Sequence, residues 1–261
     1  MIGIYKQNIR HIPCLFVVDE KREKDPLPLV IYFHGFTSAK EHNLDTAYLL
    51  AEKGFRVVLP DSLHHGEREK GISAEDRMLS FWDIVMENVK ELELMKHTLD
   101  EKGLILSGNI AVAGTSMGGI TTAAALTKYS WIKGAAIMMG TPKLTAYFRF
   151  LIDHVQKTRK IPLTEKEIAA AEEKIQQYDL SQKMDNLHGR PLFFWHGEQD
   201  TTIPIHFTEP FVEDAKGFYE NKDRIQWIKE REQGHKVSRK AKLALADWLG
   251  NYSDANHFKI G

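Results

Sequence analysis

The pentapeptide Gly114-Thr115-Ser116-Met117-Gly118 is the most informative stretch of the sequence. The apolar run 109–113 precedes it, and residues 119–126, which are rich in small side chains, follow it. A strand, a Gly-x-Ser-x-Gly turn and a helix together describe a sharp, strained turn that exposes a serine hydroxyl, and the two glycines leave the turn room. The following helix brings its N-terminal N–H groups and its dipole to the same point. Ser116 is therefore the predicted nucleophile of an acyl-transfer enzyme.

Strand patterns alternate with helix patterns along most of the chain. Leu29–Phe33 is a continuous apolar run, typical of a strand buried on both faces, and Phe81–Lys102 repeats apolar residues at helical spacing. Further strands are expected at 12–18, 55–59, 110–113, 134–139, 192–195 and 225–229, and further helices at 43–53, 117–129, 208–219 and 238–249. This alternation predicts an α/β fold with a mostly parallel central sheet and helices on both faces.

Two parts of the chain depart from this alternation of strand and helix patterns. We expect residues 2–5 to pair with 12–18 as an opening hairpin or edge, and Pro13 favours an edge position because proline cannot donate a ladder hydrogen bond. The polar stretch 62–80 is expected to be a long loop.

Residues 142–185 contain two helical patterns and no strand pattern. We expect a single α/β domain over residues 1–261, with a small helical cap inserted at about 142–185. The alternative is a pair of packing helices with no role at the site. The charged stretch 164–174 is expected to be a solvated helix face. The first of the two helical patterns carries four large apolar residues, which either pack the cap or line an acyl pocket: Tyr147, Phe148, Phe150 and Leu151.

Polar residues follow several of the predicted strands. Ligands of such sheets bind at the carboxyl ends of the strands, so these residues are expected to gather at one rim. They are His34, Asp61, Ser116, Thr141 and the segment Glu198–Asp200.

A serine hydroxyl needs a base that takes its proton, and the base needs an acid that fixes its tautomer. His235, after the last predicted strand, is the candidate base, and Asp200, just past the strand 192–195, is the candidate acid. Glu198 is the nearest rival for the acid, and Asp61 is less favoured because it follows an earlier strand. The order Ser116, Asp200, His235 is the order of nucleophile, acid and base in hydrolases with this type of turn.

Five segments, in this order, resemble the α/β-hydrolases, especially the prolyl-oligopeptidase-like and dienelactone-hydrolase-like group of small bacterial carboxylesterases. They are His34-Gly35-Phe36, Asp61 with His65–Arg68, Gly114–Gly119, His196–Asp200 with Ile203-Pro204, and Gly234-His235. The chain departs from dienelactone hydrolases, which use cysteine at the position of Ser116. It also has no segment long enough for the propeller domain of prolyl oligopeptidases. The resemblance therefore implies a compact serine esterase.

The oxyanion of the reaction needs hydrogen-bond donors. The geometry of the turn predicts that the N–H of Met117 is one donor, and the second should come from the loop after strand 29–33. The resemblance implies that this second donor is the N–H of Phe36. We expect His34 to shape this loop rather than to transfer protons, whereas three other residues either fix a neighbouring loop or line the pocket wall: Asp61, His65 and Arg68.

These residues predict a serine hydrolase that cleaves carboxylic esters of small to medium acyl groups through an acyl-enzyme on Ser116. The same triad could serve a peptidase or aryl-amidase, a thioesterase or an acyltransferase. A non-catalytic binding protein of this fold is disfavoured because all three triad residues are present.

Composition excludes several other classes. The 261 residues carry a formal net charge of −1, which gives no basis for binding nucleic acid or an anionic membrane. The sequence has no apolar run of about 18 residues and no N-terminal signal pattern. Cys14 is the single cysteine, which is compatible with a reducing compartment, so a cytoplasmic protein acting on a small-molecule ester is expected.

No cofactor or metal is expected. The segment Gly114–Gly119 lacks the Gly-x-Gly-x-x-Gly spacing and the lysine of nucleotide-binding loops. His64 and His65 are neighbours in sequence, so their side chains usually diverge, and no HExxH or Cys/His spacing accompanies them.

Overall fold

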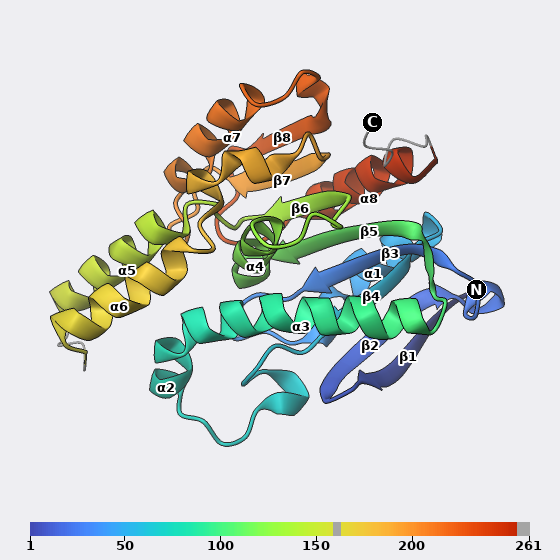
Figure 1. Ribbon diagram of the computed structural model, residues 1–261, viewed down its shortest axis with the longest axis horizontal. Helices are drawn as coiled ribbons and strands as arrows, with labels where there is room; N and C mark the ends of the chain where they lie inside the picture. The colour runs from blue at the N-terminus through green and yellow to red at the C-terminus, as the bar shows by residue number, and fades with distance from the viewer. Residues whose placement is uncertain (159–162, 255–261) are drawn as a thin grey trace.

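The computed structural model describes residues 1–158 and 163–254. An eight-stranded sheet runs through the molecule in the order β1-β2-β4-β3-β5-β6-β7-β8 (Figure 1). The strands are β1 (Ile2–Ile9), β2 (Ile12–Asp19), β3 (Leu27–Phe33), β4 (Arg56–Pro60), β5 (Ile105–Thr115), β6 (Gly134–Met138), β7 (Leu192–Gly197) and β8 (Ile225–Glu230).

The six strands from β4 to β8 in spatial order are parallel, and β2 is antiparallel to both β1 and β4. The expected opening hairpin is therefore confirmed. The expected edge position of Pro13 is wrong, because β1 covers the outer side of β2. Pro13 is tolerated in this inner strand since the pairing of β2 with β4 begins one residue later, at Cys14.

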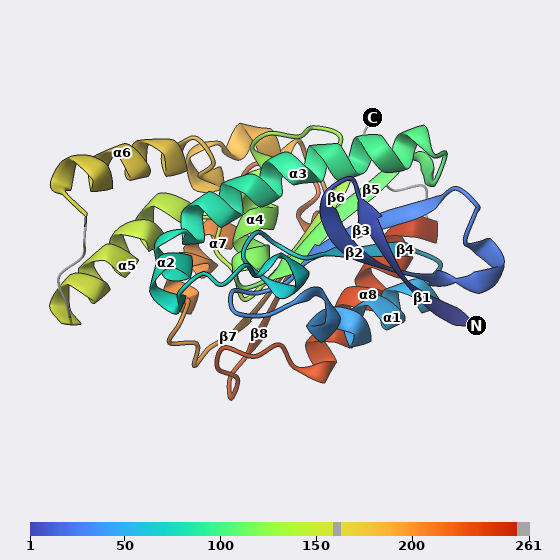
Figure 2. The same ribbon diagram turned by 90° about the horizontal axis from the view of Figure 1, so that it is seen from below.

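Helices cover both faces of the sheet, as Figure 2 shows. Each face has its own cluster of buried apolar side chains, one beneath α1 and α8 and the other beneath α3, α4 and α7. This layered, mostly parallel arrangement is the predicted α/β architecture. The bounds of these helices are α1 (Leu44–Glu52), α3 (Phe81–Glu101), α4 (Met117–Leu126), α7 (Glu209–Lys216) and α8 (Arg239–Asp254).

Between β6 and β7 the chain leaves the sheet and forms α5 (Leu144–Thr158) and α6 (Glu165–Gln176), which project beyond the end of the sheet (Figure 1). None of the described residues in this segment forms a strand. Thr164 and Glu167 form a capping box that fixes the start of α6. An ion pair between Arg149 and Glu172 joins the two helices.

The stretch after β4 is more ordered than the sequence predicts. Residues 62–80 contain a 3₁₀ turn at Gly66–Arg68 and the helix α2 (Ala74–Leu79). Ser73 caps α2 by accepting a hydrogen bond from the N–H of Asp76 at 3.0 Å. The expected loop was wrong because a helix of six residues is too short to show a clear apolar period. No helix in the described part of the chain combines the length and apolarity needed to cross a membrane.

Candidate active site

Ser116 occupies the turn between β5 and α4 with a backbone φ of 56° and ψ of −115°. A positive φ is strained for a residue with a side chain. The flanking glycines are required by space: a Cβ on Gly114 would lie 2.3 Å from the carbonyl carbon of Gly118, and a Cβ on Gly118 would lie 2.1 Å from the carbonyl oxygen of Phe33. The N–H of Ser116 donates to the carbonyl of Met138 at 2.9 Å. The local sequence thus forces the predicted turn.

Buried Arg190 stabilises the opposite end of α4. Its guanidinium donates to the carbonyl of Leu126, the last residue of the helix, at 3.1 Å and to that of Tyr129, just beyond it, at 2.8 Å. These bonds satisfy carbonyls that a helix C-terminus leaves without an intrahelical partner. Burial lowers the pKa of Arg190 to about 10, so the side chain remains charged at neutral pH. No pattern in the sequence points to a buried Arg190, because arginine is usually a surface residue.

The three predicted triad residues form one hydrogen-bonded chain. Ser116 Oγ lies 2.8 Å from His235 Nε2, and His235 Nδ1 lies 2.7 Å from Asp200 Oδ2. Because an ionised carboxylate only accepts, Nδ1 carries the imidazole proton and Nε2 is free to accept the proton of the Ser116 hydroxyl. The other carboxylate oxygen of Asp200 accepts the N–H groups of Thr202 and Ile203, each at 2.9 Å.

Asp200 remains ionised in spite of its burial. Burial raises the pKa of this carboxyl, but hydrogen bonds from His196, His235 and the N–H of Ile203 outweigh it and hold the pKa well below its usual range. His196 Nε2 lies 2.7 Å from the carbonyl of Ile203 and 3.4 Å from Asp200 Oδ2, so it is a second donor toward the carboxylate. No pattern in the sequence points to this role of His196.

The loops that carry Asp200 and His235 touch each other beyond the ends of β7 and β8. A Cβ on Gly197 would lie 2.3 Å from the carbonyl oxygen of Gln233, and the N–H of Gln199 donates to that carbonyl at 2.9 Å. This approach places the acid beside the base. Glu198, the rival acid, is exposed, and the carboxylate that contacts the base is that of Asp200.

His34 fixes the loop after β3. Its Nδ1 lies 2.8 Å from the carbonyl of Gly35, and its Nε2 accepts the N–H of Ser62 at 3.0 Å. A carbonyl can only accept and an N–H can only donate, so these contacts place the proton on Nδ1. Burial lowers the pKa of His34 to about 4, which keeps the ring neutral. The ring is thus a structural link, as its position in the sequence predicts.

His65 links the same loop from the other side. Its Nδ1 lies 2.8 Å from the carbonyl of Leu63, and its Nε2 accepts the N–H of Thr37 at 3.1 Å. Burial lowers the pKa of His65, so this ring also stays neutral. The rings of His65 and Phe36 pack edge to face with centroids 5.3 Å apart. The loop 34–37 is therefore held by two neutral imidazoles.

Asp61 organises the loop 61–68 around a buried ion pair. Its carboxylate accepts the Lys40 ammonium at 2.6 Å, the Lys40 N–H at 3.1 Å and the Glu67 N–H at 3.0 Å. The Lys40 side chain is fully buried. Burial alone would lower the pKa of Lys40, but hydrogen bonds to Asp61, Glu67 and Glu41 outweigh it and raise the pKa. No pattern in the sequence pointed to a buried Lys40.

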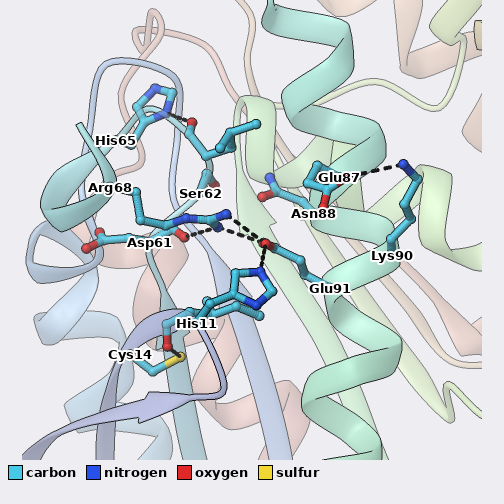
Figure 3. A network of polar contacts seen from close by, with 12 residues as sticks. His11, Cys14, Asp61, Ser62, His65, Arg68, Glu87, Asn88, Lys90 and Glu91 are labelled. Atoms are coloured by element: carbon cyan, nitrogen blue, oxygen red, sulfur yellow. Dashed lines mark hydrogen bonds and ion pairs between the residues drawn. The ribbon is translucent and has the colours of Figure 1, made fainter. Parts of the chain in front are cut away.

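Arg68 ties this loop to α3 and to the opening hairpin, as Figure 3 shows. Its guanidinium binds both oxygens of Glu91, at 2.7 and 2.8 Å, and donates to the carbonyl of Asp61 at 3.1 Å. His11 Nε2 lies 3.0 Å from Glu91 Oε1. Of the two roles that the sequence left open for Asp61, His65 and Arg68, these contacts favour fixing the loop, and none of the three lines the cavity beside Ser116.

A cavity of about 570 Å³ opens beside Ser116, between α2 and α3 on one side and α5 and α6 on the other. Tyr147, Phe148 and Leu151 line it, whereas Phe150 does not and instead stacks on Tyr147 with ring centroids 6.1 Å apart. The expectation of a pocket lining is therefore correct for Tyr147, Phe148 and Leu151, and the expectation of packing within the cap is correct for Phe150. Thr141 follows β6 as expected, but its hydroxyl donates to the carbonyl of Phe207 and the residue does not line the cavity.

Titratable side chains elsewhere do not assemble a metal centre in the part of the chain that the structure describes, where no cluster of three or more His, Cys, Asp or Glu residues could hold an ion. His64, the neighbour of His65, has a φ of 62° in the turn that leads into Gly66–Arg68.

The sequence matches the prolyl oligopeptidase family over residues 42–255. The protein YitV of Bacillus subtilis (strain 168) is 44% identical over 97% of this chain and 100% of its own length. Esterase YjfP of Escherichia coli (strain K12) is 30% identical over 78% of this chain and 81% of its own length. The crystal structure of TT1662 from Thermus thermophilus superposes with a TM-score of 0.77, at 18% identity, over 98% of this chain and 99% of that one.

The matches to YitV and to TT1662 extend over nearly the whole chain. They confirm the resemblance that the five ordered segments indicate, and the similarity to a solved structure confirms the fold. The chain belongs to the prolyl oligopeptidase family and has the α/β-hydrolase fold.

Proposed function

We propose that this protein is a serine esterase that hydrolyses carboxylic esters of small molecules. The observation that carries the proposal is the hydrogen-bonded chain from Ser116 through His235 to Asp200, in which Ser116 lines an apolar cavity. The word esterase in the names of YitV and YjfP supports the same bond type.

The reaction proceeds through an acyl-enzyme. Ser116 Oγ attacks the ester carbonyl while His235 Nε2 takes the hydroxyl proton, and Asp200 stabilises the imidazolium that forms. The proton then passes from His235 to the leaving alcohol. A water molecule, activated by the same nitrogen, hydrolyses the acyl-enzyme and restores Ser116.

The negative charge of the tetrahedral intermediate falls on the former carbonyl oxygen. We assign its two donors to the N–H groups of Met117, at the start of α4, and of Phe36, in the loop 34–37. His34 and His65 support this assignment, since their contacts fix the backbone on both sides of Phe36. They act as positioning residues and do not touch the substrate.

We further propose that residues 1–261 form one domain in which the segment 142–185 acts as a cap over the site. The cavity walls that α5 and α6 contribute support this role. Residues 159–162 and 255–261 of these ranges lie outside the described part of the chain. We place the enzyme in the cytoplasm, because its single cysteine, Cys14, is a buried free thiol that needs no oxidising compartment.

The test is hydrolysis of p-nitrophenyl butyrate together with labelling by a fluorophosphonate probe. Ser116→Ala should abolish both, whereas Ser130→Ala, in the exposed loop after α4, should leave both unchanged. Labelling that persists in Ser116→Ala would refute the assignment. Matched butyryl thioester and butyryl anilide substrates separate an esterase from a thioesterase or amidase, and faster cleavage of either one would replace the proposed bond type.

A further inference from the structure

We propose that the cavity beside Ser116 binds a straight acyl chain of medium length, so that the preferred substrates are esters of linear fatty acids of roughly ten carbons. This inference rests on the proposed function and specifies its substrate. The cavity is continuous from Ser116 to the outer parts of α5 and α6, since residues from both places line it.

The length of the cavity follows from the helix that forms one of its walls. Tyr147, Leu151 and Val155 of α5 all line it and lie four residues apart, on one face of the helix. A helix rises about 1.5 Å per residue, so these side chains span about 12 Å. An alkyl zigzag advances roughly 1.3 Å per bond because a C–C bond is about 1.5 Å long, so about nine or ten carbons fill this distance.

The lining is suited to hydrocarbon. Aromatic side chains of Phe36, Trp82 and Tyr147 line the cavity. The Tyr147 hydroxyl donates to the carbonyl of Thr202, in the loop of Asp200, at 3.1 Å, so this end of α5 lies beside the triad. At the outer part, Met78 is 37%, Leu79 41% and Leu163 38% exposed, although all three line the cavity. Such apolar surface is costly to leave in water, and a bound alkyl chain would cover it.

Small residues on α6 provide the room for such a chain. Ala170 and Ala171 line the cavity opposite α5, where larger side chains would fill it. The charged residues of the lining are exposed and lie at its solvent edge rather than in its interior: Asp83, Glu167 and Lys174.

The alkyl chain that this cavity binds belongs to the acyl side of the ester. The acyl group stays bound to Ser116 after the alcohol has left, and an enclosed apolar wall stabilises it throughout the reaction. The alcohol side must open to water, because water attacks the acyl-enzyme from that side.

The experiment measures kcat/KM for p-nitrophenyl esters from acetate to palmitate. For the unmodified protein we expect kcat/KM to rise by up to about fourfold per methylene, to reach a maximum near octanoate or decanoate and to fall at palmitate. Ala171→Phe should lower the ratio of decanoate to acetate hydrolysis at least tenfold. Val155→Phe, which narrows the same cavity from α5, should also lower this ratio if Ala171→Phe folds poorly.

The matched control is Ala169→Phe, an exposed position of α6 that does not line the cavity, and it should leave the profile unchanged. A profile that falls steadily from acetate, or a decanoate-to-acetate ratio that both cavity variants leave intact, would overturn the inference. So would a chain-length optimum seen with alkyl acetates instead of acyl esters. Acetate hydrolysis that depends on Ser116 in the same assay would leave the proposed esterase standing in each of these cases.

Discussion

The backbone N–H of Thr37 donates a hydrogen bond to Nε2 of His65 at 3.1 Å and so couples the loop after β3 to the loop after β4. Phe36, whose N–H we assign to the oxyanion, immediately precedes Thr37. Thr37 itself has a positive φ of 59°, a conformation that needs support from outside the loop. The oxyanion donor therefore depends on a side chain that never contacts the substrate.

Replacement of His65 should reduce the rate of reaction with little effect on ground-state binding. His65→Phe keeps a ring against Phe36 but removes the acceptor, and we expect kcat to fall by up to about 10², the order of a lost oxyanion donor, with KM nearly unchanged. His65→Gln, whose amide oxygen can accept the Thr37 N–H, should recover part of kcat. Steady-state kinetics on p-nitrophenyl butyrate provide the measurement. Equal losses in both variants would contradict the role of the hydrogen bond.

Neutralising the triad acid should be far more damaging than neutralising its neighbour. Asp200→Asn removes the charge that stabilises imidazolium and reverses the preferred tautomer, so kcat should fall by about 10⁴. Glu198→Gln changes an exposed carboxylate on the same loop and should leave kcat within about twofold. The comparison uses kcat at saturating butyrate ester. A large loss in Glu198→Gln would reopen the choice of acid.

Stability should decrease in mild acid because of His34. Its pKa is lowered to about 4 in the folded protein, so between the ordinary value of 6.5 and about 4 the unfolded chain binds the proton and the folded chain does not. The free energy of unfolding should therefore fall as the pH drops through this window, by roughly 3 kcal/mol in total from this group. Urea unfolding at a series of pH values measures the slope. His34→Gln should flatten it, whereas replacement of exposed His97 should not.

Removal of the Lys40 ammonium should destabilise the fold strongly. Lys40→Met leaves the buried Asp61 carboxylate without its cation, and the free energy of unfolding should fall by about 3–5 kcal/mol. The double variant Lys40→Met with Asp61→Asn should recover part of this loss, since the uncompensated charge is gone. Lys90→Met breaks an exposed pair with Glu87 and should change stability by less than about 1 kcal/mol. Denaturant titration decides between these outcomes.

The predictable parts of this structure have local causes. The turn at Ser116 follows from glycines two positions away on either side, and β3 follows from an uninterrupted apolar run. Both triad partners follow strands, so a parallel sheet places them at one rim. The prediction of the α/β fold needed only these short-range patterns together with the order of the strands.

The unpredicted parts are contacts between distant residues of ordinary appearance. Lys40 stands between an alanine and a glutamate, a context that indicates surface, and it is buried only because Asp61 and Glu67 converge on it. Arg190 meets helix carbonyls about 60 positions earlier in the chain. Such pairs leave no periodic signal. The inner position of Pro13 was missed for the related reason that the neighbouring strand, not its own sequence, determines it. The helix α2 was missed because six residues are too few to show a clear apolar period.

The insertion of α5 and α6 between β6 and β7 has an evolutionary consequence. Ser116 is held by β5 and α4, and the acid and the base are held by contacts between the loops after β7 and β8. These contacts lie outside α5 and α6, and the cap meets the loop of the acid through the Tyr147 hydroxyl of α5, which donates to the carbonyl of Thr202 at 3.1 Å. Selection can therefore rebuild those two helices in length and composition around Tyr147, and so move the enzyme between substrates, while the geometry of proton transfer is inherited unchanged.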